Sequence, residues 1–357
     1  MMISRRGLLA GSAALAAFGG PAQAGPGALA DAAAARGLLF GASIGDEAFN
    51  DPAYADLYRR EARILTTDVA LKFDWLRPGR DRFEFERADR IVGQAQKTGK
   101  PLRGHTLIWN DRTPDWLRAL PGAEVERVFD EHIERVVSRY AGKMHSWDVV
   151  NEPFWPMDRQ KGGWRNGPWL AAMGPAYVER AFRRARAIDP LAKLTLNEAQ
   201  CENDHDWGRS IRPPLAGLVE DLLHKGAPLH AVGFQSHIRP QWPHDFEAFA
   251  GYASGFGDKG LEVYLTEFDV DDSSFPDDIA ARKRACAEAG GSFLAAARRI
   301  KGLKMLVTWQ LADRYSWYRD VWKAMNPGSA RQPAPLAFGD DLQPNPLHAA
   351  LLSALSA

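Results

Sequence analysis

Eight short apolar runs, each followed by a longer stretch of different periodicity, constrain the fold of this chain most strongly. The runs cover residues 37–43, 64–73, 101–109, 144–152, 192–198, 230–238, 261–270 and 304–313. Their apolar character is continuous rather than alternating, which is typical of parallel strands that are covered on both faces. We therefore predict eight parallel strands.

The stretches between these runs carry apolar residues at helical spacing. Residues 124–140 form one such stripe, and Gly142 stands where a helix would end. Residues 177–188 form another stripe, which stops before Pro190. Both patterns predict amphipathic helices whose apolar faces pack against a sheet.

The alternation of strand and helix predicts an α/β fold, a single-domain (β/α)8 TIM barrel over residues 25–357. No Pro/Gly/Ser linker is long enough to separate two domains. A doubly wound open sheet is the alternative. Such a sheet usually carries G-x-G-x-x-G after its first strand, and "GASIGDE" does not match that pattern.

The charge and aromatic content favour a neutral partner. The 45 Lys and Arg residues balance the 45 Asp and Glu residues, so net charge does not favour nucleic acid or an anionic membrane surface. Twelve Trp residues supply many flat apolar faces, and sugar rings present a complementary face. A carbohydrate partner is consistent with both observations.

The N-terminal sequence predicts export. Arg5 and Arg6 precede an apolar stretch over residues 7–19, and residues 22–24 form an A-x-A cleavage pattern. We expect a twin-arginine-type signal peptide over residues 1–24, with the mature protein periplasmic or secreted. A membrane anchor is the alternative, but the stretch is shorter than the roughly 20 apolar residues that a span needs.

Polar and aromatic side chains stand at the ends of seven of the eight predicted strands. In chain order they are Lys72, His105, Trp109, Asn151, Glu152, Asn197, Glu198, Gln235, His237, Glu267, Asp269 and Trp309. The carboxyl ends of barrel strands meet at one mouth, where barrel enzymes build their active sites. Glu152 and Glu267 would both lie there, and two carboxylates at one mouth suit glycoside hydrolysis. Pro153 predicts an extended backbone at Glu152.

Five motifs in order resemble those of the retaining endo-β-1,4-xylanases of glycoside hydrolase family 10. They are "GHTLIW", "WDVVNE", "GFQSHI", "YLTEFD" and "WQLADRYSW", and the similarity runs from about Gly37 to the eighth strand. The resemblance implies that Glu152 is the general acid/base and Glu267 the nucleophile, with their carboxyl groups roughly 5 to 5.5 Å apart.

The same resemblance implies roles for the residues around the two carboxylates. Asn151 and Gln235 would hold the sugar and the surroundings of the nucleophile, and His237 would hydrogen-bond Glu267. The glycone subsites would be lined by Lys72, His105, Trp109, Trp309 and Trp317. We expect Asp269 to support these residues. For Asn197 and Glu198 we expect a structural or rim role only.

The sequence also departs from the family pattern at the predicted glycone end. Asp68 and Val69 stand where the family usually has Glu-Asn, Asn110 replaces a His, and Gln310 replaces a Gly. The first pair would serve the second glycone sugar, so its binding is expected to weaken. Each hydrogen bond lost there costs on the order of 1 kcal/mol.

Several further expectations concern loops and partners. We expect Trp116 to pack in the protein, whereas Trp164 and Trp169 could either pack or contact sugar. Pairing of Cys201 with Cys286 stays open. The sequence contains no H-x-H or H-E-x-x-H motif, and we expect neither a metal nor an organic cofactor.

The predicted partner is a β-1,4-linked polysaccharide, xylan, bound by a monomer, with no nucleic acid and no membrane after signal cleavage. Two alternatives stay open. One is another β-glycanase, acting on a glucan, which the change at Asp68 and Val69 motivates. The other is a catalytically silent glycan-binding protein, against which the presence of both Glu152 and Glu267 argues.

Overall fold

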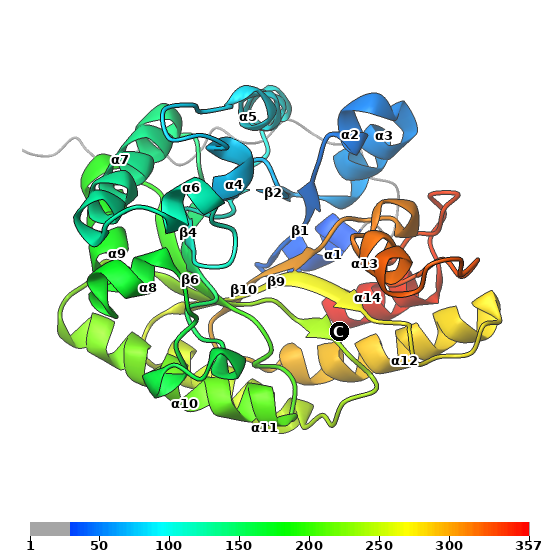
Figure 1. Cartoon of the computed structure of the whole chain (residues 1–357). Coiled ribbons are helices and arrows are strands. Elements are labelled where there is room, and N and C mark those ends of the chain that lie inside the picture. Colours follow the sequence, from blue (N-terminus) through cyan, green and yellow to red (C-terminus); the bar gives the residue numbers. More distant parts are fainter. Residues whose placement is uncertain (1–28, 357) are drawn as a thin grey trace, which may run out of the picture.

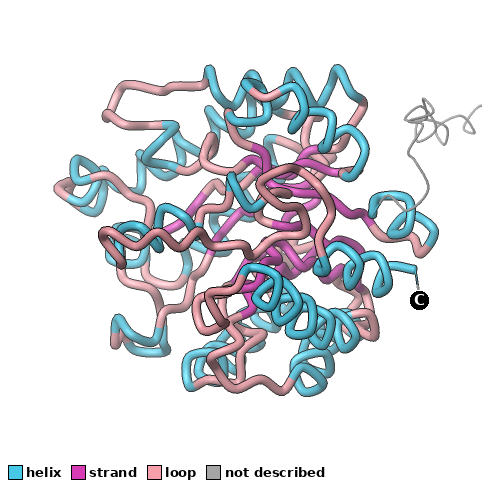
Figure 2. Tube along the Cα trace, turned by 90° about the vertical axis from the view of Figure 1, so that its right-hand side faces the viewer, coloured by secondary structure: helices cyan, strands magenta, loops and turns pink. Residues whose placement is uncertain are grey.

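Ten strands form one closed parallel sheet in the computed structural model, which describes residues 29–356. Figures 1 and 2 show the strands at the centre of the molecule and the helices around them. The strands are β1 (Leu39–Ile44), β2 (Ile64–Thr67), β3 (Leu102–Gly104), β4 (Ile108–Trp109), β5 (Ser146–Asn151), β6 (Lys193–Glu198), β7 (Ala231–Phe234), β8 (His237–Ile238), β9 (Glu262–Val270) and β10 (Leu303–Thr308). The predicted signal peptide over residues 1–24 lies outside the described residues.

The strand order closes the sheet into a barrel. Neighbours run β10, β1, β2, β3, β5, β6, β7, β9, and β9 pairs back onto β10, all in parallel. β3 and β4 both pair with β5, and β7 and β8 both pair with β9, so each of these couples occupies one barrel position. The ten described strands thus fill eight positions. The predicted eight-stranded parallel barrel is confirmed, and the open-sheet alternative is wrong.

Helices cover the outside of the barrel. The longer ones are α3 (Pro52–Glu61), α5 (Glu86–Thr98), α7 (Gly122–Tyr140), α9 (Ala176–Ile188), α10 (Asp206–His224), α11 (Phe246–Asp258), α12 (Ile279–Ala297) and α14 (Pro346–Ser356). The shorter ones are α1 (Leu29–Ala35), α2 (Glu47–Asn50), α4 (Phe73–Leu76), α6 (Asp115–Arg118), α8 (Pro168–Met173) and α13 (Tyr318–Met325), with 3-10 turns η1 (Pro156–Asp158), η2 (Lys161–Gly163) and η3 (Asp313–Tyr315).

Both helices that periodicity predicted are present. α7 and α9 bury their predicted apolar stripes, including Phe129 and Phe182. At the end of α7, Gly142 has a φ of 71°, a left-handed conformation that glycine adopts without a steric penalty. The last described helix, α14, packs against both α12 and the first described helix, α1.

The predicted strand over residues 64–73 is too long. β2 ends at Thr67, and the N–H of Lys72 donates to the carbonyl of Val69 at 3.0 Å, which turns the chain into α4. Ala70 and Leu71 are apolar because they are buried in this turn, not because the strand continues. A buried turn and a buried strand have the same apolar composition, so the run alone did not separate them.

The barrel interior is filled by side chains from several strands. Ile64, Ala231, Tyr264, Met305 and Val307 form a small buried cluster there, separate from the larger core between sheet and helices. Packing of the interior leaves the mouth at the carboxyl ends of the strands as the place where polar side chains converge. No helix among residues 29–356 is long and apolar enough to cross a membrane.

Candidate active site

The two predicted catalytic carboxylates are fixed at the barrel mouth by the neighbouring strands. Glu152 follows β5, and its N–H donates to the carbonyl of Asn197 at 2.9 Å. Glu267 lies in β9, and its N–H donates to the carbonyl of Gln235 at 2.8 Å. Both are buried, with 8% and 5% of their surface exposed. Their backbones are therefore held by the sheet itself, which makes the site rigid.

The backbone of Glu152 differs from the expectation. Pro153 predicts an extended residue, but Glu152 has a φ of 46°, in the left-handed region that non-glycine residues rarely adopt. The surrounding contacts account for this conformation. The N–H stays in the sheet through Asn197, while the carbonyl turns to accept a hydrogen bond from Nε of Arg165 at 3.1 Å. Such local strain is typical of functional sites.

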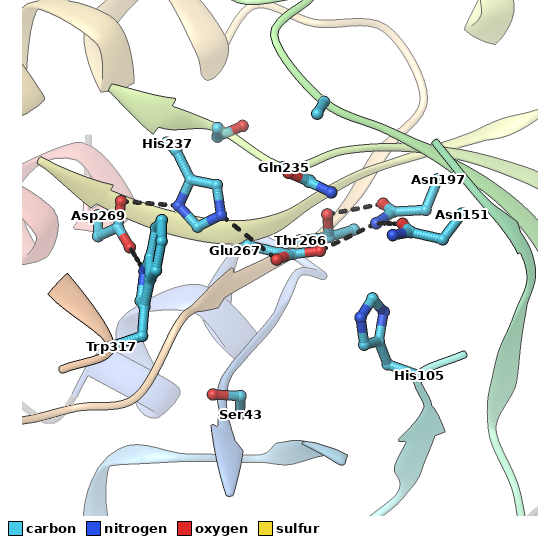
Figure 3. Close-up of polar contacts among 12 residues, drawn as sticks. Ser43, His105, Asn151, Asn197, Gln235, His237, Thr266, Glu267, Asp269 and Trp317 are labelled. Carbon is cyan, nitrogen blue, oxygen red and sulfur yellow. Dashed lines mark hydrogen bonds and ion pairs between the residues drawn. The ribbon is translucent and has the colours of Figure 1, made fainter. Parts of the chain in front are cut away.

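Two asparagine amides connect the carboxylates. Nδ2 of Asn197 donates to Oδ1 of Asn151 at 2.8 Å and to Oε1 of Glu267 at 3.0 Å, as Figure 3 shows. Nδ2 of Asn151 lies 3.4 Å from Oε1 of Glu152. The hydroxyl of Thr266 donates to Oδ1 of Asn197 at 2.8 Å and so fixes the orientation of that amide. We expected a structural or rim role for Asn197, and its amide also contacts Glu267 directly.

His237 and Asp269 support Glu267 from the other side (Figure 3). Nε2 of His237 lies 3.3 Å from Oε2 of Glu267, and Nδ1 lies 2.8 Å from Oδ1 of Asp269. Nε1 of Trp317 donates to the second oxygen of Asp269 at 3.0 Å. The predicted hydrogen bond between His237 and Glu267 is present, and Asp269 has the expected supporting position.

The electrostatics of this group keep Glu267 charged. Burial alone raises the pKa of Glu267, but the hydrogen bond from His237 and the charges of His105 and His237 outweigh it and lower the pKa to about 2. Burial likewise disfavours the charged form of His237, but Asp269 and Glu267 raise its pKa to about 10. A charged, oriented carboxylate is the form that a nucleophile requires.

Glu152 is surrounded by hydrogen-bond donors. Nε2 of Gln235 donates to Oε1 at 2.6 Å, and Nη2 of Arg165 pairs with Oε2. The side chain of Gln235 therefore contacts the predicted acid/base, while its carbonyl lies beside the nucleophile, where we expected this residue. Arg165 was not predicted at all. It lies in the loop over residues 154–176, and no periodic pattern in the sequence indicates how that loop folds back.

Lys72 lies between two indole rings. Its Nζ is 5.7 Å from the centroid of the Trp109 ring and 5.3 Å from that of Trp309. The imidazole of His105 meets the ring of Trp309 edge-on at 5.2 Å. The structure thus brings together four of the residues predicted to line the glycone subsites, although they come from three separate strand ends. Indole faces and an ammonium group can together bind a sugar face and its hydroxyls.

A buried ion pair lies behind His105. Nδ1 of His105 is 2.8 Å from Oδ2 of Asp148, which also pairs with Arg103, and all three side chains are buried. Asp148 holds Nδ1, so the imidazole is fixed in orientation. Arg103 and Asp148 were not predicted. The sequence did contain a signal for both residues. Each is a charged residue inside an apolar strand run, and a buried charge needs a partner of opposite charge.

Glu198 is a third buried carboxyl group near Glu152. Burial and the negative charge of Glu152 raise its pKa well above the usual value. Its two oxygens accept hydrogen bonds from the backbone N–H groups of Ala199 at 2.9 Å and Phe154 at 3.2 Å. The second contact ties the end of β6 to the chain just after Glu152. This is the structural role that we expected.

Two of the positions that depart from the family pattern contact each other. Nε2 of Gln310 donates to Oδ2 of Asp68 at 2.8 Å, and Oε1 of Gln310 accepts from the hydroxyls of Tyr54 and Tyr58. Gln310 has a φ of 73°, which a glycine would adopt without strain. Asp68 is therefore tied to the loop after β10.

The three loop tryptophans considered in the sequence analysis all pack within the protein. Trp169 is fully buried against Phe129 and Phe73, and Trp116 packs on Phe73 as predicted. Trp164 packs against Phe154 with ring centroids 4.6 Å apart. The structure thus assigns both of the open cases, Trp164 and Trp169, to packing.

A row of three other indoles was not predicted. Trp155 lies 5.1 Å from Trp207, which lies 5.8 Å from Trp242, and all three are partly exposed. The guanidinium of Arg165 stacks on Trp155 at 4.2 Å, so the row begins beside Glu152. The high Trp count indicated that indole platforms exist. The three residues are far apart in sequence, however, so the sequence did not indicate that they meet.

The described residues form neither a disulfide nor a candidate metal site. Cys201 and Cys286 are both buried and free, so the disulfide that the sequence left open is not formed. Within residues 29–356, no group of three or more His, Cys, Asp or Glu side chains is arranged to hold a metal ion.

Comparison with known proteins adds independent information. The family description "Glycosyl hydrolase family 10" matches residues 28–354. A β-1,4-xylanase of Dictyoglomus thermophilum is 32% identical over 82% of this chain and 81% of its own. Endo-1,4-β-xylanase B of Thermotoga neapolitana is 29% identical over 84% of this chain and 82% of its own.

Solved structures give the same result. The native xylanase 10B of Thermotoga maritima superposes with a TM-score of 0.81 at 27% identity, over 92% of this chain and 98% of that one. The xylanase 10B of Thermotoga petrophila RKU-1, solved with xylobiose, superposes with a TM-score of 0.80 at 28% identity, over 92% and 97%. Since the match to the family spans nearly all of the described residues, the chain belongs to glycosyl hydrolase family 10.

Proposed function

We propose that this protein is a retaining endo-β-1,4-xylanase that hydrolyses internal bonds of xylan. The observation that carries the proposal is the pair Glu152 and Glu267 at one barrel mouth, connected through the amides of Asn151 and Asn197. The names of the related proteins, β-1,4-xylanases and endo-1,4-β-xylanases, support the choice of substrate. We further expect an exported monomer that needs neither metal nor organic cofactor.

The proposed reaction has two steps. In the first, Glu267 attacks the anomeric carbon, the glycosidic bond breaks, and Glu152 gives its proton to the departing oxygen. In the second, Glu152 takes a proton from water, whose oxygen bonds to the anomeric carbon while the bond to Glu267 breaks. The hydrogen bond from His237 holds Glu267 in place for attack.

The arrangement of aromatic residues supports action on a polymer. Lys72, Trp109 and Trp309 form one group, and the row of Trp155, Trp207 and Trp242 begins beside Arg165, which contacts Glu152. Indole faces are suitable platforms for successive pyranose rings. A substrate bound along both groups would extend to either side of the cleaved bond.

The experiment is mass analysis of the products released over time from unbranched β-1,4-xylan. Carboxymethyl-cellulose, mannan and mixed-linkage glucan are incubated in parallel. We expect a ladder of short xylo-oligosaccharides from xylan and little or no product from the other three polymers. Release of single xylose units from chain ends would contradict the endo assignment.

A second candidate, a glucan-acting β-1,4-glycanase, is favoured by one observation, the contact between Asp68 and Gln310 at the predicted glycone corner. Release from glucan with no release from xylan would establish it. A catalytically silent binding protein is tested separately with Glu267→Ala. That variant should lose turnover but still bind xylohexaose in calorimetry, whereas unchanged turnover would show that Glu267 is not the nucleophile.

A further inference from the structure

Arg165 holds Glu152 at two points. Its Nη2 pairs with Oε2 of the Glu152 carboxylate, and its Nε donates to the Glu152 carbonyl at 3.1 Å. The N–H of Arg165 also donates to the carbonyl of Pro153 at 2.8 Å. One residue thus fixes the side chain, the carbonyl and the following residue of the predicted acid/base. No motif of the sequence indicated this contact.

The guanidinium of Arg165 is buried against an indole ring. It stacks on the ring of Trp155 at 4.2 Å, and only 6% of the Arg165 surface is exposed. Phe154 and Trp164 form an isolated antiparallel bridge, which brings Arg165 back beside Glu152. Asp111 is the other acidic partner, but its carboxylate is 3.7 Å away and half exposed. Glu152 is therefore the main charge partner of this buried cation.

Every contact of the Glu152 carboxylate comes from a donor. Oε1 faces the amide nitrogens of Gln235 and Asn151, and Oε2 faces Arg165. This set of contacts suits a charged carboxylate, which only accepts hydrogen bonds. It does not suit the protonated acid of the first step, which must direct a proton towards the leaving oxygen. A cavity of about 380 Å³ is lined by both Glu152 and Arg165.

We propose that Arg165 is a positioning residue for the second step of the reaction, an inference that rests on the retaining mechanism proposed above. It orients the Glu152 carboxylate and stabilises its negative charge while that carboxylate takes a proton from water. The water oxygen bonds to the anomeric carbon, and Glu267 leaves as a carboxylate. Removing Arg165 should therefore slow the second step more than the first.

An activated substrate separates the two steps. From 2,4-dinitrophenyl β-xylobioside the leaving group departs without a proton, so kcat reports the second step and kcat/KM the first. Arg165→Met should lower kcat and KM together by about tenfold and leave kcat/KM within about twofold, because general base catalysis contributes only in the second step. Added azide needs no base, so it should restore kcat and give a glycosyl azide.

Two further variants sharpen the test. Arg165→Lys keeps the positive charge and should recover part of the lost kcat. Arg118→Met is the matched control, because Arg118 lines the same cavity but donates only to the main-chain carbonyls of Asn110, Asp111 and Thr113. Its kcat should match that of the wild type. If Arg165→Met does not fold, Arg165→Gln is measured by the same criteria.

The outcomes are distinct. An unchanged kcat in the Arg165 variant would overturn the inference. A fall of kcat/KM in parallel with kcat, without rescue by azide, would show a merely structural role and also overturn it. In both cases a wild-type enzyme active on xylan leaves the proposed function intact. A wild type that hydrolyses neither the xyloside nor xylan would overturn both proposals.

Discussion

At Glu267, burial and hydrogen bonding act on the same charge in opposite directions. Burial favours the neutral acid, while His237 and the charge of His105 favour the carboxylate and lower the pKa to about 2. His237 can do this because Asp269 holds its other ring nitrogen. The charge state of the nucleophile thus depends in part on Asp269, a carboxylate that does not touch it.

Asp269→Asn tests this relation. The substitution keeps the shape but removes the charge that favours protonated His237, so the pKa of Glu267 should rise. The acidic limb of the kcat/KM profile should then move to higher pH by about one unit, since a nearby opposite charge shifts a pKa by roughly that much. The measurement is kcat/KM on an aryl β-xylobioside between pH 1.5 and 8, because the wild-type limb is expected near pH 2.

The control is Asp271→Asn, because Asp271 contacts Gln241 and Ser273 rather than His237. Its acidic limb should match that of the wild type. An unmoved limb in Asp269→Asn, in a protein that unfolds at the wild-type temperature, would show that Asp269 does not act through His237.

At the scale of elements, two loops far apart in sequence determine the predicted glycone corner. Asp68 follows β2 and Gln310 follows β10, and their side chains are hydrogen-bonded at 2.8 Å. β1 lies between these two strands in the barrel and pairs with both. The two departures from the family pattern are therefore one structural change.

Gln310→Gly should release Asp68. A glycine fits the φ of 73° without strain, and the freed carboxylate could bind the second glycone sugar. We expect kcat/KM on p-nitrophenyl β-xylobioside, relative to the β-xyloside, to rise about fivefold, which corresponds to one hydrogen bond of about 1 kcal/mol. Leu342→Gly, at another positive φ of 62°, is the control and should leave the ratio unchanged. An unchanged ratio in Gln310→Gly would mean that Asp68 does not serve that sugar.

The sequence predicted elements that depend on local periodicity. The stripes of α7 and α9, and the continuous apolar runs, indicated the alternation of helices and strands correctly. The end of β2 was wrong because a buried turn has the same composition as a buried strand. Regular elements repeat one contact pattern along the chain, so a short window of sequence is enough to recognise them.

The contacts of the site were less predictable. Strand ends indicated which residues reach the mouth, but Arg165 reaches Glu152 through an irregular loop, and Gln310 reaches Asp68 across 242 residues. The row of Trp155, Trp207 and Trp242 likewise joins two loops and the first turn of α10. Such contacts depend on tertiary packing, for which no single stretch of sequence carries a signal.

At the scale of the whole molecule, several buried groups make stability depend on pH in opposite directions. The lowered pKa of Glu267 stabilises the folded state above about pH 4.5, and this contribution is lost as the pH falls towards 2. The raised pKa of His237 contributes below about pH 6.5, and this is lost as the pH rises through 10. Asp313 behaves differently, because burial raises its pKa from 3.8 to about 7.

Asp313 should therefore reduce stability as the pH rises. Between pH 3.8 and 7 the folded protein binds more protons at this group than the unfolded chain does, so the free energy of unfolding falls with pH. Asp313→Asn mimics the neutral acid and can still accept the N–H of Leu336, which Asp313 accepts at 2.8 Å. Between pH 4 and 8 the variant should lose less unfolding free energy than the wild type, by at least about 1.4 kcal/mol, the value of one pKa unit.

Urea unfolding at pH 4, 6 and 8 measures this difference. Asp258→Asn is a control, because Asp258 is exposed and pairs with Lys301 at the surface. Parallel pH profiles for Asp313→Asn and the wild type would show that Asp313 does not titrate in this range.

The most direct test of the proposed mechanism is to trap its covalent intermediate. The enzyme is incubated with 2,4-dinitrophenyl 2-deoxy-2-fluoro-β-xylobioside, whose fluorine slows the second step so that the glycosyl-enzyme accumulates, and the labelled peptide is identified by mass spectrometry. We predict one fluoroxylobiosyl group per chain, attached to Glu267. A label on Glu152 or on any other residue, or hydrolysis of xylan with inversion and no covalent adduct, would contradict the account.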